Sequence, residues 1–451
     1  MKINNLTVPL HYVIYNGIRY SQDPIFLINK TLESYNTSTY HLNVGKSKRM
    51  LTKDPEVINH ILQKNHKNYI KSKIVTDILS KYAGKGILTT NGDYWLKQRR
   101  LIQPGFHKRK IESLLTDMNA VIVELVDDIT EKINQGQDQF DILDEMTKMT
   151  LRIVSKALFS STISEDQIKI LKDGVQALQD ITMKEAQNPF LSSWRKLSGY
   201  QKKSEDHLAR IYELITTYIT KRRADTNPPS DLMSMLLDAR YEGTDTGMDN
   251  QQILDEILII FVAGFETTTN ALTFCLYLLS KHPTERSKLQ AELNNIKLSA
   301  NPTIQDVMMM KYTSQVISES MRLYPPAWFM DRVAIEDDLI GEEKVCAGEI
   351  IALYTYGMHR STEYWTDPDS FKPDRFSDDN KSKIVTNSFI PFGKGPRLCI
   401  GSQFAQMEMN LVLYHFIKRF NFALVEPYVL DLETKITIRP KHGMPLKLRN
   451  R

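Results

Sequence analysis

A glycine-rich loop near the C-terminus carries the residues whose types and spacing point most directly to chemistry. Residues 391–401 read PFGKGPRLCIG and include one of only three cysteines in the chain. A phosphate-binding loop needs GxxxxGK followed by Ser or Thr, and Lys394 comes too early for that pattern. The loop instead has the spacing F-x-x-G-x-R-x-C-x-G, formed by Phe392, Gly395, Arg397, Cys399 and Gly401. The pattern therefore centres on the sulfur of Cys399, although a cysteine without such neighbours is most often an inert core thiol.

This loop resembles the cysteine-ligand loop of the cytochrome P-450 family, the haem-thiolate monooxygenases. The resemblance implies haem b (iron-protoporphyrin IX) as cofactor, with Cys399 as its axial thiolate. A thiolate ligand pushes electron density onto the iron and favours O–O cleavage. Phe392 would cover the sulfur, Arg397 would pair with a haem propionate, and Gly401 would allow the backbone to approach the flat macrocycle.

A second family pattern lies upstream of the loop. Glu319 and Arg322 of the segment ESMR are three residues apart on one face of a predicted helix. Taken alone they are typical of a surface ion pair. Arg375 in FKPDRF matches the third member of the family's buried Glu-Arg-Arg cluster, which is structural there. Asp374 replaces the usual glutamate before Arg375, a departure that does not touch the cluster.

Two further segments resemble the family's propionate-binding positions. Trp95 and Arg99 of WLKQR reproduce its W-x-x-x-R pattern on a predicted helix. Arg332 follows Pro326 by six residues and resembles another propionate partner, with looser spacing. The alternative for WLKQR is an amphipathic helix with a solvated basic face.

One long helix is predicted from near Asp249, a suitable N-cap, to about Ser280, just ahead of Pro283. Roughly 30 residues give a length of about 45 Å, enough to cross the whole molecule. Its centre, AGFETTT, places a glycine, an acid and three threonines inside an apolar segment. Glycine costs about 1 kcal/mol there relative to alanine, and a buried acid needs a partner or its proton. Such departures at the centre of a buried helix indicate a working site.

This central segment resembles the family's A-G-x-D/E-T-T. The resemblance implies that Ala263 and Gly264 lie beside the haem and that a local widening of the helix opens a groove for dioxygen. Thr267 would hold and protonate the bound oxygen, while Glu266 would relay protons from solvent. From the residues alone, a threonine bonded to its own helix and an acid paired in the core would be the alternative.

Composition and periodicity predict a mainly helical fold with small peripheral β-sheets, which matches the cytochrome P-450 fold. Apolar residues follow a helical period in 112–133 and 208–224, while β-like stretches lie near 38–52 and in parts of 330–357 and 430–450. No repeat or low-complexity linker divides the sequence, so residues 1–451 are expected to form one large helical domain around the long helix.

Charge and cysteine usage limit the partners and the compartment. The formal net charge of +4 and the lack of like-charge blocks argue against nucleic acid and lipid surfaces. Three scattered cysteines make a disulfide framework unlikely and favour a reducing, cytoplasmic compartment. The longest strongly apolar run, residues 257–265, falls short of the ~20 residues that span a bilayer, and the N-terminus lacks the pattern of a signal peptide. We therefore expect a monomer without a transmembrane anchor.

The resemblance also implies a class of substrate and a source of electrons. A distal pocket lined by Phe265, Ala327, Trp328 and Phe329 would take a small, largely apolar substrate, such as a fatty acid, terpenoid or carotenoid. Phe190, Leu191 and Trp194 of NPFLSSW could form an apolar entrance. Dioxygen would be the second substrate. Electrons would come from a separate ferredoxin or flavodoxin with its reductase, docking on a basic patch of Lys97, Arg100, residues 107–110 and Lys394.

Two other functions use the same thiolate loop. A haem-thiolate sensor would not need Glu266 and Thr267. A peroxygenase or isomerase would dispense with the reductase and usually with this acid–alcohol pair.

Overall fold

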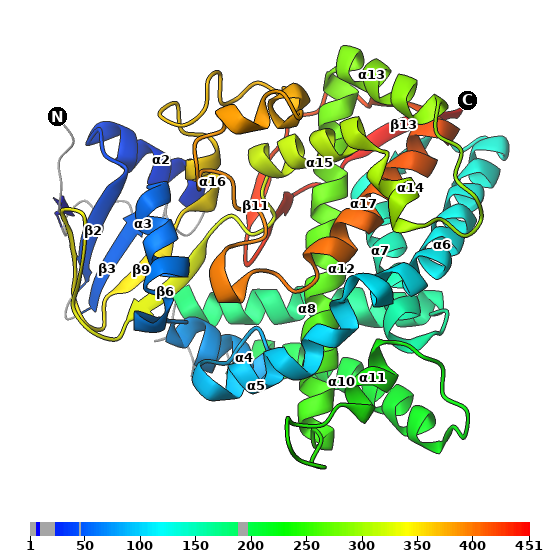
Figure 1. Cartoon of the computed structure of the whole chain (residues 1–451). Coiled ribbons are helices and arrows are strands. Elements are labelled where there is room, and N and C mark those ends of the chain that lie inside the picture. Colours follow the sequence, from blue (N-terminus) through cyan, green and yellow to red (C-terminus); the bar gives the residue numbers. More distant parts are fainter. Residues whose placement is uncertain (1–5, 10–22, 45–46, 188–196) are drawn as a thin grey trace.

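Helices form most of the chain, and a six-stranded sheet lies beside them, at the left of Figure 1. The computed structural model describes residues 6–9, 23–44, 47–187 and 197–451. The predicted fold, mainly α with small peripheral sheets, is confirmed. The longer helices are α2 (Pro24–Ser34), α5 (Gly92–Ile102), α6 (Lys108–Asn134), α7 (Ile142–Phe159), α8 (Glu165–Gln187), α10 (Tyr200–Ala224), α12 (Asn250–Lys281), α13 (Pro283–Asn294), α15 (Lys311–Leu323) and α17 (Ser402–Arg419). The shorter ones are α3 (Pro55–Asn59), α4 (Ser80–Ala83), α11 (Leu232–Asp238), α14 (Ile304–Met308) and α16 (Thr355–His359).

Strands occur in the three predicted stretches, and β1, β4, β5 and β10 lie outside them. A six-stranded sheet has the order β1-β2-β3-β9-β6-β4, and β10-β13-β5 form a second sheet. The strands β7 and β8 pair with each other, as do β11 and β12. Their bounds are β1 Thr7–Val8, β2 Thr39–Val44, β3 Ser47–Thr52, β4 Tyr69–Ile70, β5 Gln139–Asp141, β6 Met330–Ala334, β7 Asp338–Ile340, β8 Glu343–Val345, β9 Ile350–Leu353, β10 Phe420–Leu424, β11 Leu432–Thr434, β12 Ile438–Pro440 and β13 Pro445–Asn450.

The helix α12 crosses the height of the molecule in Figure 1 and packs against α7, α15 and α17. It begins where the sequence predicts, because the Asp249 carboxylate accepts a hydrogen bond from the Gln252 N–H at 2.8 Å. It ends at Lys281, two residues before Pro283. Among the described helices, α12 is long and apolar enough to cross a membrane, but 67% of its most apolar window is buried inside the protein. This burial is that of a core helix.

A cluster of charged side chains connects α15 to the segment that leads into the cysteine loop. Glu319 and Arg322 are fully buried, and Arg375 reaches the same carboxylate at 3.2 Å. The remaining Arg322 N–H groups donate to the carbonyl oxygens of His359, Pro368 and Ser370. The structure therefore brings together the three residues that the sequence grouped, and it satisfies the buried charges with hydrogen bonds.

Candidate active site

The loop before α17 holds Cys399 in a tight backbone turn. Gly395 has φ +70°, and an added Cβ would lie 2.0 Å from the Leu62 carbonyl oxygen, so only glycine fits there. The Cys399 N–H donates to the Phe392 carbonyl at 3.0 Å, and the Leu398 N–H donates to the Gly395 carbonyl at 3.0 Å. These bonds fix the thiol next to the N-terminus of α17, where the helix dipole favours a thiolate.

The Cys399 side chain keeps accessible surface although protein surrounds the sulfur. This close surrounding raises the pKa of the thiol, while the Gly401 N–H and the Arg99 charge act in the opposite direction. Gly401 itself has φ −87°, and the nearest atom to an added Cβ is Phe106 Cε1 at 3.8 Å. No contact within the described protein requires a glycine at 401, so its predicted role beside a macrocycle stays a prediction.

Three cations gather near the cysteine loop without carboxylate partners. Arg332 is 7% exposed and donates to the Asp331 carbonyl oxygen at 2.6 Å. Arg397 donates to the Thr90 carbonyl at 3.2 Å, and its guanidinium lies 4.1 Å from the centre of the Trp95 ring. Lys71 donates to the carbonyls of residues 87 and 88. Within the described part of the chain, none of the three cations forms an ion pair with an acid.

The pKa shifts show that these cations lie close to one another. Burial and, to a smaller extent, the nearby charge of Arg332 together lower the pKa of Arg397 to about 9. Burial also lowers the pKa of Lys71; the charges of Arg397 and Arg332 add to that effect, and those of Asp331 and Glu256 oppose it. Cations held this close together repel one another, and the two carboxylates of a ligand would stabilise them. The cluster therefore fits the propionates of haem beside an available thiol.

Arg99 binds the backbone of the cysteine loop itself. Its Nη1 donates to the Leu398 carbonyl at 2.9 Å, and the Cys399 charge opposes the lowering of its pKa by burial. Arg99 therefore supports the cysteine loop, and a direct propionate contact stays a prediction. The sequence missed Lys71 because no motif marks it. Only the folded chain brings Lys71 to Arg332 and Arg397.

The exposed side of α12 is the stripe formed by Ala263 and Thr267, one helical turn apart. The Thr267 hydroxyl donates to the Ala263 carbonyl at 2.8 Å, which leaves its lone pairs free to accept. The expected widening of the helix is absent, since residues 250–281 form an uninterrupted α-helix. An added Cβ at Gly264 would lie 3.1 Å from Val154 Cγ2, so close packing on α7 accounts for this glycine.

Glu266 is buried on another side of α12, where neutral groups hold it. Thr437 Oγ1 donates to Glu266 Oε1 at 2.6 Å, and Gln179 Nε2 donates to the same oxygen. Burial raises the pKa of Glu266, while these hydrogen bonds and the charges of Arg439 and Lys435 oppose the rise. The predicted need of the buried acid for a partner is confirmed.

A cavity of about 110 Å³ adjoins Glu266. Gln179 and Asn270 line it beside the acid, and Asp144 and Lys172 line it at their surface ion pair. The cavity thus places polar side chains, together with the apolar Leu143, Val175 and Phe265, next to the buried carboxyl group.

Two of the predicted pocket residues belong to the core. Phe265 is 4% exposed and packs against Phe261 with ring centres 5.8 Å apart, because it lies about 200° around the helix from Ala263. Trp328 is 5% exposed, and its indole N–H donates to the Lys435 carbonyl at 3.0 Å. Ala327 and Phe329 are half-buried. Phe190, Leu191 and Trp194 lie outside the described residues.

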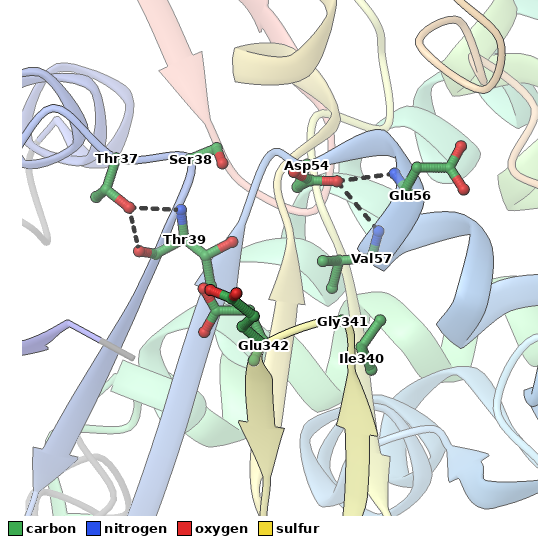
Figure 2. Close-up of a pocket in the computed structure, with 10 residues that line it drawn as sticks. Thr37, Ser38, Thr39, Asp54, Glu56, Val57, Ile340, Gly341 and Glu342 are labelled. Atoms are coloured by element: carbon green, nitrogen blue, oxygen red, sulfur yellow. Dashed lines mark hydrogen bonds between the residues drawn. The ribbon is translucent and has the colours of Figure 1, made fainter. Parts of the chain in front are cut away.

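A larger cleft of about 250 Å³ lies in the sheet region and shares no residue with this site. Figure 2 shows Asp54 in its wall, accepting hydrogen bonds from the N–H groups of Glu56 and Val57 at 2.8 and 3.2 Å. Thr37 Oγ1 similarly donates to the Thr39 carbonyl at 2.7 Å. These polar groups stabilise local turns and present no reactive pair.

Comparison with known proteins agrees with this geometry. A family model described as cytochrome P-450 matches residues 7–445. Carotene epsilon-monooxygenase of Arabidopsis thaliana, a chloroplast protein, is 29% identical over 91% of this chain and 79% of its own length. Cyclooctat-9-en-7-ol 5-monooxygenase of Streptomyces melanosporofaciens is 30% identical over 84% of this chain and 81% of its own length. The family model covers nearly the whole sequence, and the chain belongs to the cytochrome P-450 family of haem-thiolate monooxygenases.

Proposed function

We propose that this chain binds haem b through Cys399 and inserts one oxygen atom of dioxygen into a largely apolar substrate. The observation that carries the proposal is the accessible Cys399 thiol beside three cations that have no carboxylate partner. Lys71, Arg332 and Arg397 would hold the propionates, with Trp95 stacked on Arg397. Bound haem supplies the activation of dioxygen, and the protein supplies the ligand, protons and orientation.

Residues of α12 would supply the protons for the reaction. Thr267 presents a hydroxyl on the accessible stripe, where it can accept a hydrogen bond from an oxygen species and pass on a proton. Glu266 would store that proton, because its raised pKa favours the protonated form. The cavity beside Glu266 would refill it from solvent. The acid–alcohol pair favours a monooxygenase over a sensor or a peroxygenase.

A cluster of apolar side chains packed on α12 supports the substrate class. We call it the distal apolar cluster; Ile259 lies in it, one turn before Ala263 on the same side of the helix. The other buried members are Leu79, Tyr82, Ala83, Leu178, Ile181 and Leu208, and partly buried ones are Val75, Ile78, Ile87, Tyr200, Tyr212 and Ile436. Its partly buried members are apolar and aromatic side chains of the kind that would line a pocket for a hydrocarbon skeleton. Two relatives are named for a carotene and a cyclooctatenol, which favours a carotenoid or terpenoid over a fatty acid.

The electron donor would be a separate ferredoxin or flavodoxin with its reductase, bound at the predicted basic patch. Lys97 and Arg100 are exposed on α5, although Arg100 also pairs with Glu242 at 3.1 Å. Lys110 donates to Ser230, and Lys394 donates to Asn387. An acidic partner could compete for these weak surface interactions. A cytoplasmic monomer with one domain remains part of the proposal.

The deciding experiment combines a binding screen with turnover. Purified holoenzyme is titrated with terpenoids, carotenoids and fatty acids while the Soret band is followed for displacement of water from the iron. A compound that binds is then incubated with oxygen, a ferredoxin and its reductase. Product that requires the electron donor supports a monooxygenase. Product formed equally from hydrogen peroxide alone indicates a peroxygenase, and binding without any turnover indicates a sensor.

A further inference from the structure

The tip of the β11–β12 hairpin places three consecutive side chains in three different environments. Lys435 Nζ lies 2.6 Å from Asp180 Oδ1 on α8. Ile436 packs against the distal apolar cluster. Thr437 donates to the Glu266 carboxylate at 2.6 Å. A single turn of the chain therefore contacts both the distal apolar cluster and the carboxyl group of Glu266.

Hydrogen bonds link the backbone of the tip to itself and to the segment 326–328. The Lys435 N–H donates to the Thr437 carbonyl at 2.9 Å, which closes the turn. The Trp328 indole donates to the Lys435 carbonyl at 3.0 Å, and the Ile438 N–H donates to the Pro326 carbonyl at 3.1 Å. The hairpin is thus anchored on both sides of the tip. A displacement of Ile436 must be absorbed within the turn and shifts its neighbour Thr437.

Thr437 is the centre of a small hydrogen-bond network around the acid. It donates to Glu266 and accepts from Asn270 Nδ2 at 3.3 Å, while Gln179 supplies the second donor to the same carboxylate oxygen. These bonds hold Glu266 toward the cavity and away from the Thr267 stripe. Loss of the Thr437 hydroxyl would leave a buried carboxylate with one neutral donor, which favours its movement to another polar environment.

We propose that the hairpin tip couples occupation of the distal apolar cluster to proton delivery. An apolar molecule that displaces Ile436 withdraws the Thr437 hydroxyl from Glu266, and the freed carboxyl group turns toward Thr267. Thr437 is a positioning residue, because it acts through Glu266. This inference rests on the proposed function, since it takes Glu266 as the proton store. Its consequence is that reduced enzyme without substrate keeps its proton donor locked, which limits the loss of electrons to oxygen.

The first test follows reoxidation of substrate-free holoenzyme. The reduced protein is mixed with oxygenated buffer, and the return of the ferric Soret band is timed. One electron from ferrous iron and one proton from the freed acid convert oxygen into the hydroperoxyl radical and leave ferric iron. Thr437→Val should reoxidise several-fold faster than the parent, whereas Thr437→Ser keeps the hydroxyl and should match it. Thr434→Val makes the same change on β11 without touching Glu266, and it should also match the parent.

Reoxidation of Thr437→Val at the parental rate, with its haem spectrum intact, would overturn the proposal. The double variant Thr437→Val/Glu266→Gln separates this failure from that of the proposed function. If Glu266 is the donor, the double variant loses the acceleration. If Glu266→Gln alone changes neither reoxidation nor product yield, Glu266 is not the proton store. In that case both the role given to Glu266 in the proposed function and this inference are wrong.

The second test measures the movement of the tip directly. Clotrimazole, a bulky apolar azole that binds haem iron through its imidazole, serves as the probe for an occupied pocket. Hydrogen exchange of the peptide that contains residues 435–437 should become several-fold faster when the azole is bound. Ile436→Ala should still bind the azole, seen as a Soret shift, and should lose this response. An equal response in Ile436→Ala and the parent would show that Ile436 is not the sensor.

Discussion

The Arg322 guanidinium and the Glu319 carboxylate form a two-point ion pair within α15, with distances of 2.7 Å from Nε to Oε2 and 2.8 Å from Nη2 to Oε1, and neither side chain is exposed. The same carboxylate accepts from the Lys372 N–H at 2.9 Å and from Arg375 at 3.2 Å. One acid thus pairs with two arginines and anchors the segment that leads to the cysteine loop.

Removal of that acid should prevent assembly of the holoenzyme. Glu319→Ala leaves Arg322 buried without its counter-charge, at a cost of about 3–5 kcal/mol, a large share of a typical stability. We expect mostly insoluble or haem-free protein, measured as soluble yield and haem-to-protein ratio. Glu56→Ala is the control, because its exposed pair with Lys64 contributes little. Normal haem incorporation by Glu319→Ala would contradict the structural role of the pair.

Replacement of the thiol should change the spectrum of the haem complex. Cys399→Ser should abolish the strongly red-shifted Soret band of the reduced carbon monoxide complex, because that band requires a thiolate ligand. Cys275→Ala and Cys346→Ala should both keep it, since Cys275 is fully buried in the core and Cys346 lies beside Lys48. A Cys399→Ser variant with the unchanged band would place the iron ligand elsewhere.

The cation cluster predicts how tightly haem is held. Lys71→Met removes one of the three positive charges that would face the propionates. We expect faster loss of haem, measured as its transfer to apomyoglobin, by about tenfold or less, which corresponds to about 1.4 kcal/mol. Lys73→Met is the matched control, because Lys73 is exposed two residues away. Equal transfer rates for the two variants would remove Lys71 from the haem site.

Glu256 should give the stability of the protein a specific pH dependence. It is fully buried on α12, and burial raises its pKa from 4.5 to about 7 despite a hydrogen bond from the Ile87 N–H. The native state therefore holds this proton at pH values where the unfolded chain has lost it. Its contribution to stability is present below about pH 4.5 and is lost as the pH rises through about 7. The full change is on the order of 3 kcal/mol.

Thermal unfolding of Glu256→Gln between pH 4.5 and 8 tests this dependence. The amide cannot ionise and can still accept from Ile87, so the variant should gain in Tm relative to the parent as the pH rises. Glu242→Gln alters an exposed carboxylate and should follow the parent at every pH. A constant difference in Tm between Glu256→Gln and the parent would show that Glu256 does not titrate in this range.

Local sequence patterns predicted the parts of the site that depend on local backbone. The start of α12 follows from the Asp249 cap, and the tight turn of the cysteine loop follows from Gly395, whose φ is positive. The contacts of Glu319 with Arg322 and Arg375 also join residues that the sequence grouped. In each case a short spacing or a single backbone conformation determines the arrangement.

Contacts between distant segments could not be predicted in that way. The Glu266 partner Thr437 lies 171 residues away and belongs to no motif. Lys71 is equally unmarked, and its place beside Arg332 and Arg397 depends on how the sheet region packs on the helices. Phe265 lies in the core, on a different side of the helix from Ala263 and Thr267, and its place in a substrate pocket stays a prediction.

Thr267→Ala separates a dioxygen-activating enzyme from a haem binder. The Thr267 hydroxyl bonds only to its own helix in the described structure, and alanine favours helix, so folding and haem content should survive. Without the hydroxyl, protonation of bound oxygen becomes uncontrolled and hydrogen peroxide leaves in place of product. The ratio of product to NAD(P)H consumed should fall several-fold, while total consumption falls less. Thr273→Ala removes a hydroxyl that is likewise bonded to its own helix, at 2.8 Å from the Thr269 carbonyl, and should keep the parental ratio. An unchanged ratio in Thr267→Ala would mean that a water or the substrate itself supplies the hydroxyl at that position.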